Sequence, residues 1–273
     1  MRRLLPIPPL LTPPLTSPLT SPLARLLTSL LMACATALPA AAQTLNVAVD
    51  SSLAAAVTEI AHGFEASRPG VTVKLDAASA GLLLEGIAQR KGPGAGADLL
   101  LSADTETLAR GAERRLLATG LPRLLAGNAV VLVSPATRST PLQRLSDLAK
   151  PEVLRVALAR SATVPAGRHA RDAIDFERMW PALQRKVVLA DSVEQVLQWV
   201  ARGEVDAGFV YRTDAEGAPG VRMGQVLDSQ NPVRHAAALV AGSPHEALAR
   251  EFIELLASPA AAQTFARRGF LPP

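Results

Sequence analysis

Cysteine and tyrosine are the scarcest residue types in this 273-residue chain, with one of each, Cys34 and Tyr211. Cys34 falls in an N-terminal segment that we expect to be removed, which leaves the mature chain without a disulfide, a thiol nucleophile or a cysteine metal site. The four histidines lack the HExxH spacing, and the chain has neither a Gly-x-Ser-x-Gly elbow nor a phosphate-binding loop. These absences argue against the common hydrolase classes, so we expect no enzymatic activity.

A paired-carboxylate site is a further enzyme alternative, because Asp98 and Asp104 flank one apolar strand. A strand rises by about 3.3 Å per residue, so the two carboxylates stand at its two ends. That separation is too large for them to share a proton. The pair therefore does not predict acid–base catalysis.

Residues 1–42 differ sharply from the rest, because they contain three arginines but no acidic residue and no glycine. The apolar run at residues 26–37 is too short to span a bilayer and is followed by three alanines ending at Ala42. This pattern predicts a secretory signal cut after Ala42, and hence a location outside the cytoplasm. Acylation of Cys34, as in a lipoprotein, is the alternative, although the methionine at position 32 fits such a signal poorly.

The charge of the mature chain carries little information. Removal of the three arginines lowers the formal net charge from +4 to +1. A chain this close to neutral has no dominant basic surface, so we expect no nucleic-acid partner. With 49% hydrophobic and 19% charged residues, the chain is globular and long enough to bury one or two cores.

Short apolar segments alternate with helical patterns along the mature chain. Strands are predicted at residues 45–49, 71–75, 97–104, 128–134, 154–158, 186–189, 207–211 and 235–240. Helices are predicted between most of them, and two more close the chain at residues 244–256 and 259–268. This alternation is typical of an α/β fold. We expect two lobes, each a mainly parallel sheet flanked by helices, formed by residues 43–126 with 236–273 and by residues 127–235.

Residues 163–168, Thr-Val-Pro-Ala-Gly-Arg, form a turn between a strand and a helix. Proline suits the first turn of a helix, glycine permits close approach of the backbone, and the first N–H groups have no partner within the helix. Such a turn is suited to hold an anion, although an ordinary helix start has the same features. Similar junctions offer open amides at Ser52, Ser79 and Val193 in addition to Ala166, with the two serines at N-cap positions. If the lobes face each other, the four helix starts converge on one anion.

Five segments, in this order, closely resemble those of the periplasmic molybdate-binding proteins of ABC transporters. They are Val47 to Leu53 with its Ser52-Leu53 pair, Ala78-Ser79, Ala97-Asp98 to Ser102-Ala103-Asp104, Val164-Pro165-Ala166-Gly167, and Phe209-Val210-Tyr211. The resemblance runs from about Leu45 to Phe270, which is nearly the whole mature chain. The Val-Pro-Ala-Gly turn and the Val-Tyr strand ending are fairly specific when they occur together.

The resemblance implies a two-lobed fold of the type II periplasmic-binding-protein class, with the ligand cleft between the lobes. It implies capture of a tetrahedral oxyanion, molybdate and also tungstate, and delivery to the membrane permease of an ABC transporter, with no cofactor. In that family the oxyanion is held without a cation by two serines, two backbone amides and one tyrosine hydroxyl. By motif these are Ser52, Ser79, Ala166, Val193 and Tyr211. We expect a monomer; a periplasmic sensor or interaction module with the same lobes, or a binder of another oxyanion such as sulfate, is the alternative.

Tyr211 and Asp50 also bear on this hypothesis through their own chemistry. Tyr211 ends an apolar strand, where its O–H can point into the cleft as a donor; a core aromatic with a solvated tip is the alternative. Relatives usually have small apolar residues at the positions of Asp50 and Ser51, and a carboxylate facing the cleft would repel a dianion. We expect Asp50 to point away, where it caps a helix or forms an ion pair at the surface.

Overall fold

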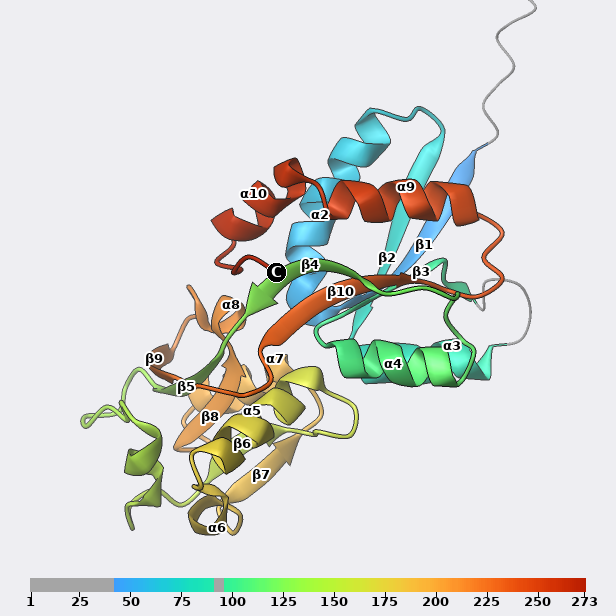
Figure 1. The fold of residues 1–273 in the computed structure, drawn as a ribbon. Helices are drawn as coiled ribbons and strands as arrows, with labels where there is room; N and C mark the ends of the chain where they lie inside the picture. The colour runs from blue at the N-terminus through green and yellow to red at the C-terminus, as the bar shows by residue number, and fades with distance from the viewer. Residues whose placement is uncertain (1–41, 91–95) are drawn as a thin grey trace, which may run out of the picture. The chain divides into compact units, whose positions relative to one another are not determined.

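The computed structural model describes residues 42–90 and 96–273. Residues 1–41 of the expected signal segment, with Cys34, lie outside the described residues, as does most of the glycine-rich loop at 91–96. Two sheets organise the described chain, and each has five strands. We call each sheet with its covering helices a lobe (Figure 1).

The first sheet has the strand order β2-β1-β3-β10-β4. Its strands are β1 (Gln43–Asp50), β2 (Val71–Ala78), β3 (Leu99–Ser102), β4 (Arg123–Asn128) and β10 (Val233–Leu239). β1 is parallel to β2 and β3, whereas β10 is antiparallel to β3 and β4.

The second sheet repeats this plan with the order β7-β6-β8-β5-β9. Its strands are β5 (Val130–Pro135), β6 (Val156–Ala159), β7 (Val187–Ala190), β8 (Ala207–Tyr211) and β9 (Val221–Val226). β6 is parallel to β7 and β8, and β5 is antiparallel to β8 and β9. The expected α/β fold with helix-flanked sheets is confirmed, and both sheets prove to be mixed.

Helices connect the parallel strands and cover the sheets. In the first lobe they are α2 (Ser51–Ala66), α3 (Ala80–Gln89), α4 (Thr105–Glu113), α9 (Glu246–Leu256) and α10 (Pro259–Arg267). In the second lobe they are the 3-10 helix η2 (Leu145–Ala149), α5 (Pro165–Phe176), α6 (Trp180–Leu183), α7 (Val193–Ala201) and α8 (Arg212–Ala215). None of the helices in the described ranges is long and apolar enough to span a membrane.

Alternation along β1 explains why the first sheet is covered on both faces. Leu45, Val47 and Val49 pack in a core with α2, α9 and α10, whereas Ala48 packs in a second core with α3 and α4. Figure 1 shows these two groups of helices on opposite faces of the sheet. The second lobe has its own core, formed by apolar residues of its strands, α5 and α7.

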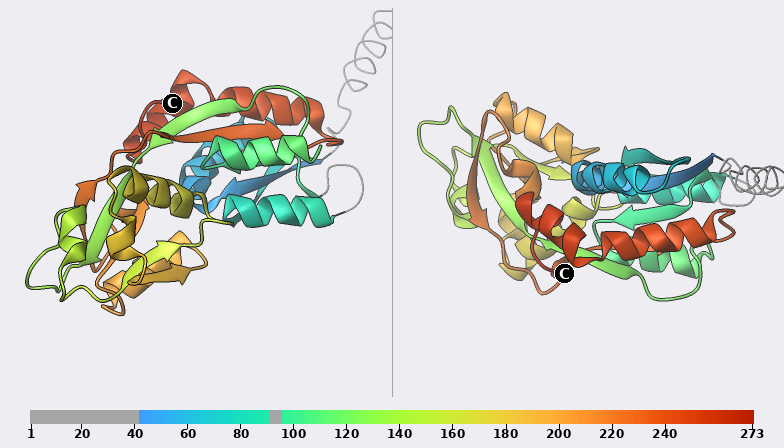
Figure 2. Two further views of the ribbon diagram at one scale, coloured as in Figure 1. Left: turned by 60° about the horizontal axis from the view of Figure 1, so that its bottom comes forward. Right: turned by 90° about the horizontal axis from the view of Figure 1, so that it is seen from above.

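The chain passes between the lobes twice. It leaves the first sheet at the end of β4 and enters β5 after Ala129 alone, and it returns between β9 and β10. Figure 2 shows β4 running on into β5, with β10 beside it. The boundaries expected at 126/127 and 235/236 fall inside β4 and β10, and the division into lobes at those positions stays a prediction.

Two strands escaped the sequence analysis, β4 and β9. Both contain a glycine, Gly127 and Gly224, and both pair antiparallel with a strand far away in the sequence. The patterns used for prediction are local, so they do not detect an edge strand that is stabilised by a distant partner.

Gly167 explains why the Val-Pro-Ala-Gly turn is so compact. It lies in the first turn of α5, and a Cβ atom there would come 2.0 Å from the carbonyl oxygen of Ala159, the last residue of β6. Only glycine lets the start of α5 pack this closely against the end of the strand.

We therefore expect Gly167→Ala to lower the free energy of unfolding by about 1–3 kcal/mol, because both clashing groups belong to the backbone and cannot rotate away. Gly63→Ala is the matched control, since nothing lies within 4 Å of a Cβ atom at this position in α2. It should stabilise the protein by about 0.5–1 kcal/mol through helix propensity. Urea unfolding of the two variants measures the difference, and equal shifts of the same sign would contradict this packing argument.

Candidate functional site

One small pocket lies where the two lobes meet, at the starts of four helices. Its walls come from α2 and α3 of the first lobe and from α5, α7 and the end of β8 of the second. The lining residues are Asp50, Ser51, Ser52, Ser79, Val164, Pro165, Ala166, Ser192, Val193, Glu194 and Tyr211. We call this the inter-lobe pocket. All five site residues predicted from the sequence line it.

The two lobes touch directly beside this pocket. The N–H of Gly81 in α3 donates to the carbonyl oxygen of Thr163, just before α5, at 3.2 Å. A Cβ atom on Gly81 would lie 2.4 Å from that oxygen, so the contact is backbone to backbone. The pocket is small, with a cavity of ≈ 20 Å³. This is room for about one water-sized group.

The cap of α2 differs from the prediction that Ser52 is the N-cap. The N-cap is Asp50, two residues earlier, and its side chain accepts from the N–H of Ser52 at 3.2 Å. A carboxylate at this position reaches the free N–H groups of the first turn, so the helix begins at Ser51 rather than after Ser52.

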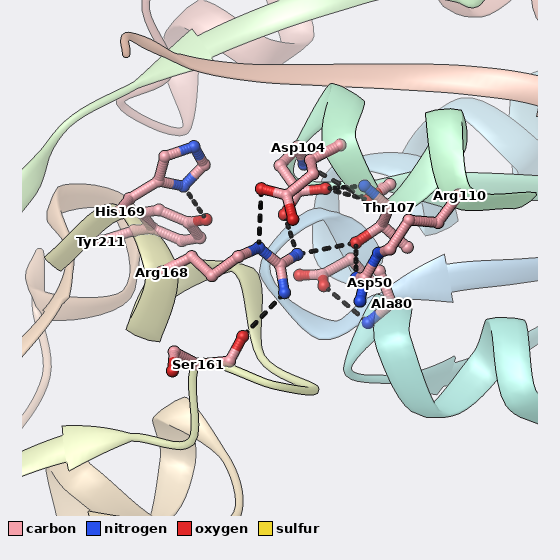
Figure 3. Close-up of polar contacts among 11 residues, drawn as sticks. Asp50, Ala80, Asp104, Thr107, Arg110, Ser161, Arg168, His169 and Tyr211 are labelled. Carbon is pink, nitrogen blue, oxygen red and sulfur yellow. Dashed lines mark hydrogen bonds and ion pairs between the residues drawn. The ribbon is translucent and has the colours of Figure 1, made fainter. Parts of the chain in front are cut away.

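Asp50 caps a helix, as expected, but it also lines the pocket, so the expectation that it points away to the surface is wrong. Only 5% of the residue is exposed. Oδ1 accepts from the Ser52 hydroxyl at 2.7 Å as well as from its N–H, and Oδ2 accepts from the N–H of Ala80 at 3.0 Å. Figure 3 shows this bond from Asp50 to Ala80. One carboxylate therefore occupies donors at the starts of both α2 and α3.

Ser79 is the N-cap of α3, as predicted, but its hydroxyl does not cap the helix. The residue is 8% exposed, and its Oγ has no hydrogen-bond partner in the structure. A buried hydroxyl without a partner is costly and calls for an explanation. Because it lines the inter-lobe pocket, a ligand with oxygen acceptors gives it one.

Ala166 and Val193 contribute main-chain N–H groups from the second lobe. Both lie in the first turns of their helices, α5 and α7, where a residue has no partner four positions earlier in the helix. Among the described residues, no backbone hydrogen bond outside the helices and strands uses either N–H. The N-cap of α5, Val164, has no side-chain acceptor to offer.

Tyr211 stands at the end of β8, 1% exposed, and its hydroxyl lies 3.0 Å from Nδ1 of His169 in α5. Burial raises the pKa of Tyr211 well above its ordinary value, so the phenol stays protonated. Burial also lowers the pKa of His169, which favours its neutral form. If Nδ1 carries the imidazole hydrogen, it donates to the phenol oxygen and leaves the phenol hydrogen for a ligand.

His235 supports Tyr211 from the first lobe. It is fully buried on β10, and its ring meets the Tyr211 ring edge-on at 5.7 Å between centroids. Burial lowers the pKa of His235 to about 3, so its imidazole ring is uncharged and acts on Tyr211 through packing alone. His169 and His235 are 66 positions apart in the sequence, and only the tertiary fold places both beside the one tyrosine.

Two acids near the pocket have raised pKa values. Burial raises the pKa of Asp50 to about 6, against the effect of its hydrogen bonds from Ser52 and Ala80, and the nearby Asp104 adds to the rise. The pKa of Asp214 is raised to about 8, mainly by burial and also by the nearby Asp50 and Glu194. At pH 7 Asp50 is therefore mostly ionised and Asp214 mostly protonated.

Arg168 follows the Val-Pro-Ala-Gly turn but does not line the pocket. Its guanidinium donates to the carboxylate of Asp104, to Thr107 Oγ1 at 2.7 Å and to the carbonyl oxygen of Ser161 at 2.8 Å (Figure 3). Burial alone would raise the pKa of Asp104, but the Arg168 charge together with the hydrogen bonds from Thr107 and Arg168 outweighs burial and lowers the pKa. Arg168 thus links α5 to the start of α4, and so ties the two lobes together.

A larger hollow of ≈ 860 Å³ lies beyond this ion pair, lined by α4, residues 117–124 and part of α5. Its lining includes carboxylates and apolar side chains at the start of α4, but none of the residues that line the inter-lobe pocket. We assign the site to the smaller pocket, because only there do unpartnered donors from both lobes converge.

The arrangement is suited to bind an anion through neutral hydrogen-bond donors. Within the described residues, no group of three or more histidine, cysteine, aspartate or glutamate side chains is placed to hold a metal ion. Open α/β sheets bind ligands beyond the carboxyl ends of their strands, so two such lobes around one pocket have the arrangement of the class of proteins that bind a small solute between them.

Comparison with known proteins agrees with that class. A family model for the bacterial extracellular solute-binding proteins matches residues 45–271, and the chain belongs to this family.

Two curated relatives cover most of the chain. The putative ABC transporter substrate-binding lipoprotein YvgL of Bacillus subtilis is 32% identical over 229 residues, which are 83% of this chain and 86% of the relative. The molybdate-binding protein ModA of Escherichia coli is 30% identical over 232 residues, which are 83% of this chain and 88% of the relative. Among solved structures, the substrate-binding domain of a putative molybdenum ABC transporter from Clostridium difficile is similar, with a TM-score of 0.65 and 27% identity over 84% of this chain and 99% of that one. All three are named for binding a substrate or molybdate.

The unpartnered hydroxyl of Ser79 leads to a stability prediction. Ser79→Ala should leave the unfolding free energy of the ligand-free protein unchanged or slightly higher, because it removes a buried hydroxyl that makes no hydrogen bond. Ser258→Ala is the matched control at the N-cap of α10, where Oγ accepts from the N–H of Ala261 at 3.2 Å. Ser258→Ala should lower the free energy of unfolding by about 1 kcal/mol, because α10 loses its side-chain cap. Chemical unfolding of both variants decides, and a larger loss for Ser79→Ala would show that its hydroxyl is engaged in the ligand-free protein.

Proposed function

We propose that the chain is the extracytoplasmic binding protein of an ABC transporter that captures molybdate, and also tungstate, in the inter-lobe pocket. The donors are the hydroxyls of Ser52, Ser79 and Tyr211 and the main-chain N–H groups of Ala166 and Val193. The anion is held through its oxygens, so no residue contacts the metal atom and no cofactor is needed. The protein releases the anion to a membrane permease.

The observation that carries this proposal is the Ser79 hydroxyl, which is buried without a hydrogen-bond partner at the wall of the pocket. The open N–H groups at the starts of α5 and α7 line the same pocket. Neutral donors fixed by the backbone are already directed at the pocket, and the cavity of ≈ 20 Å³ widens when a tetrahedral oxyanion enters between the lobes. All five donors come from a single chain, which supports action as a monomer. Molybdate is favoured over other oxyanions by the names of the relatives.

Transport places the protein outside the cytoplasm. The family of extracellular solute-binding proteins supports this location, and so does the signal-like segment before Gln43. A secreted soluble form and a form anchored through Cys34 both present the pocket to solutes, and YvgL is named a lipoprotein. Mass spectrometry of the protein from its host membrane and periplasm separates the two forms.

Removal of single donors tests the assigned pocket. Ser79→Ala and Tyr211→Phe should each weaken molybdate binding by about 1.5–3 kcal/mol, the range for a hydrogen bond to a charged group. Ser258→Ala lies outside the pocket and should leave the affinity unchanged. Calorimetric titration gives the three dissociation constants. If both pocket variants bind as tightly as the parent protein, the site has been placed wrongly.

Selectivity distinguishes a molybdate protein from a general anion binder. Donors set for long metal–oxygen bonds leave sulfate under-coordinated, and each unmet hydrogen bond should cost sulfate about 1–3 kcal/mol. At pH 6, molybdate and tungstate should therefore raise the melting temperature at micromolar concentrations, whereas sulfate should need far more. Equal shifts of the melting temperature with sulfate and molybdate would mean that the pocket binds oxyanions in general rather than molybdate. No shift with any of these anions would favour a sensor or interaction role.

A further inference from the structure

Asp50 is an acid in a pocket otherwise equipped to hold an anion, and the proposed function does not use it. Its two carboxylate oxygens accept three hydrogen bonds, two from Ser52 and one from the N–H of Ala80. Ser52 lines the pocket at the start of α2, and Ala80 is the first residue of α3, directly after the pocket residue Ser79. The carboxylate therefore stands where oxygens of a bound anion would stand.

We propose that Asp50 is a specificity-determining residue of this site: its carboxylate competes with the incoming oxyanion for the donors of α2 and α3, so that capture of a dianion takes up one proton at Asp50. This inference rests on the proposed function. The proton comes from solvent and binds one Asp50 carboxylate oxygen. The resulting O–H can donate to an oxygen of the bound anion, and the Ser52 and Ala80 donors are released to it.

Competition follows from the donors that are shared. A hydroxyl or an N–H has one hydrogen to donate, so the Ser52 hydroxyl cannot serve the carboxylate and an external oxygen fully at the same time. Two negative groups in one buried pocket also repel each other strongly, because little solvent screens them. Protonation of Asp50 removes both obstacles, whereas the other donors of the pocket are unaffected by it.

The surroundings of Asp50 decide which acid near the pocket changes its charge close to neutral pH. The first turns of α2 and α3 present only uncharged donors to it. The other titratable or charged groups near the pocket are Asp104 at the start of α4, Arg168 and His169 in α5, Glu194 in α7, Tyr211, Asp214 in α8 and His235 in β10.

Most of these neighbours keep one charge state over the range in which Asp50 titrates. Asp104 is ionised and paired with Arg168, and Tyr211 and His235 are neutral. With burial raising the pKa of Asp50 to about 6 and that of Asp214 to about 8, measurements between pH 5.5 and 7.5 report mainly on Asp50. His169, whose pKa burial lowers, is the remaining group whose contribution the variants must separate.

The test is calorimetric titration of the mature protein with molybdate between pH 5.5 and 7.5, in buffers of different ionisation enthalpy. For a single group with a pKa of about 6, the dissociation constant of the parent protein should rise about 20-fold over this range, with uptake of close to one proton per anion at pH 7.5. Asp50→Asn keeps an acceptor for Ser52 but cannot be charged. It should bind at pH 7.5 at least tenfold more tightly than the parent, with a nearly flat pH profile.

Two further variants make the outcome decisive. Asp50→Ala removes the side chain and should give the same flat profile, so it replaces Asp50→Asn if that variant does not fold. Asp214→Asn is the matched control, and it should keep the parent's pH dependence. A pH slope that persists in both Asp50 variants would assign the effect to another group such as His169 and overturn the proposal, as would a parent protein whose affinity does not change with pH.

The ligand-free protein supplies an independent measurement. Because the folded pKa of Asp50 lies above the ordinary value of 3.8, the folded state binds the proton more tightly than the unfolded state. The melting temperature of the parent should therefore fall, relative to Asp50→Asn, as the pH rises from 4 through 6. If this holds but no variant binds molybdate, tungstate or sulfate at any pH, the proposed function fails and the competition has no ligand. If the anion binds without proton uptake, only the inference about Asp50 fails.

Discussion

Main-chain N–H groups at the start of a helix have no partner within that helix, and the inter-lobe pocket depends on this constraint. Two such starts, α2 and α3, come from the first lobe, and two, α5 and α7, come from the second. Each follows a parallel strand of its sheet, so the folding of each sheet brings two helix starts to one edge. The contact between Gly81 and Thr163 then sets the two edges against each other.

The four starts meet this constraint in different ways. α2 and α3 share the carboxylate of Asp50, which satisfies donors of both helices within the protein. α5 begins with Pro165 after an N-cap without a polar side chain, so the N–H of Ala166 stays open, and the hydroxyl of Ser192 caps α7 through Gln195 and leaves Val193 open. The first lobe thus carries its own anion, whereas the second offers free donors. This asymmetry is why we regard Asp50, rather than any single donor, as the residue that governs entry of a ligand.

Two contacts beside the pocket join one lobe to the other. The Arg168–Asp104 pair joins α5 to α4, and with side chains only 14% and 5% exposed it is screened little by water. On the other side, His235 of β10 packs on Tyr211 of β8, next to the strands that pass between the lobes. A change of lobe angle therefore acts on the tyrosine hydroxyl and on the helix starts together, which is the coupling that a closing binding protein needs.

The sequence by itself determined most of the alternation of strands and helices, the positions of four helix starts to within two residues, and five of the eleven residues that line the pocket. These features are local, because a strand ending, a proline in a first turn and a glycine close to a strand are each visible within a few residues. Gly167 is an example, since its close contact is with Ala159, only eight positions away.

Only the tertiary structure decided where Asp50 points, what Arg168 does and why β4 and β9 are strands. The Asp50 carboxylate is turned inward by the N–H of Ala80, thirty residues away, and Arg168 is held by Asp104, 64 residues away. A side chain at the end of a strand has similar local preferences in either direction, and its choice depends on which donors the fold brings within hydrogen-bond distance. Burial then raised the pKa of that carboxyl group, and burial is a property of the packed protein rather than of the sequence around it.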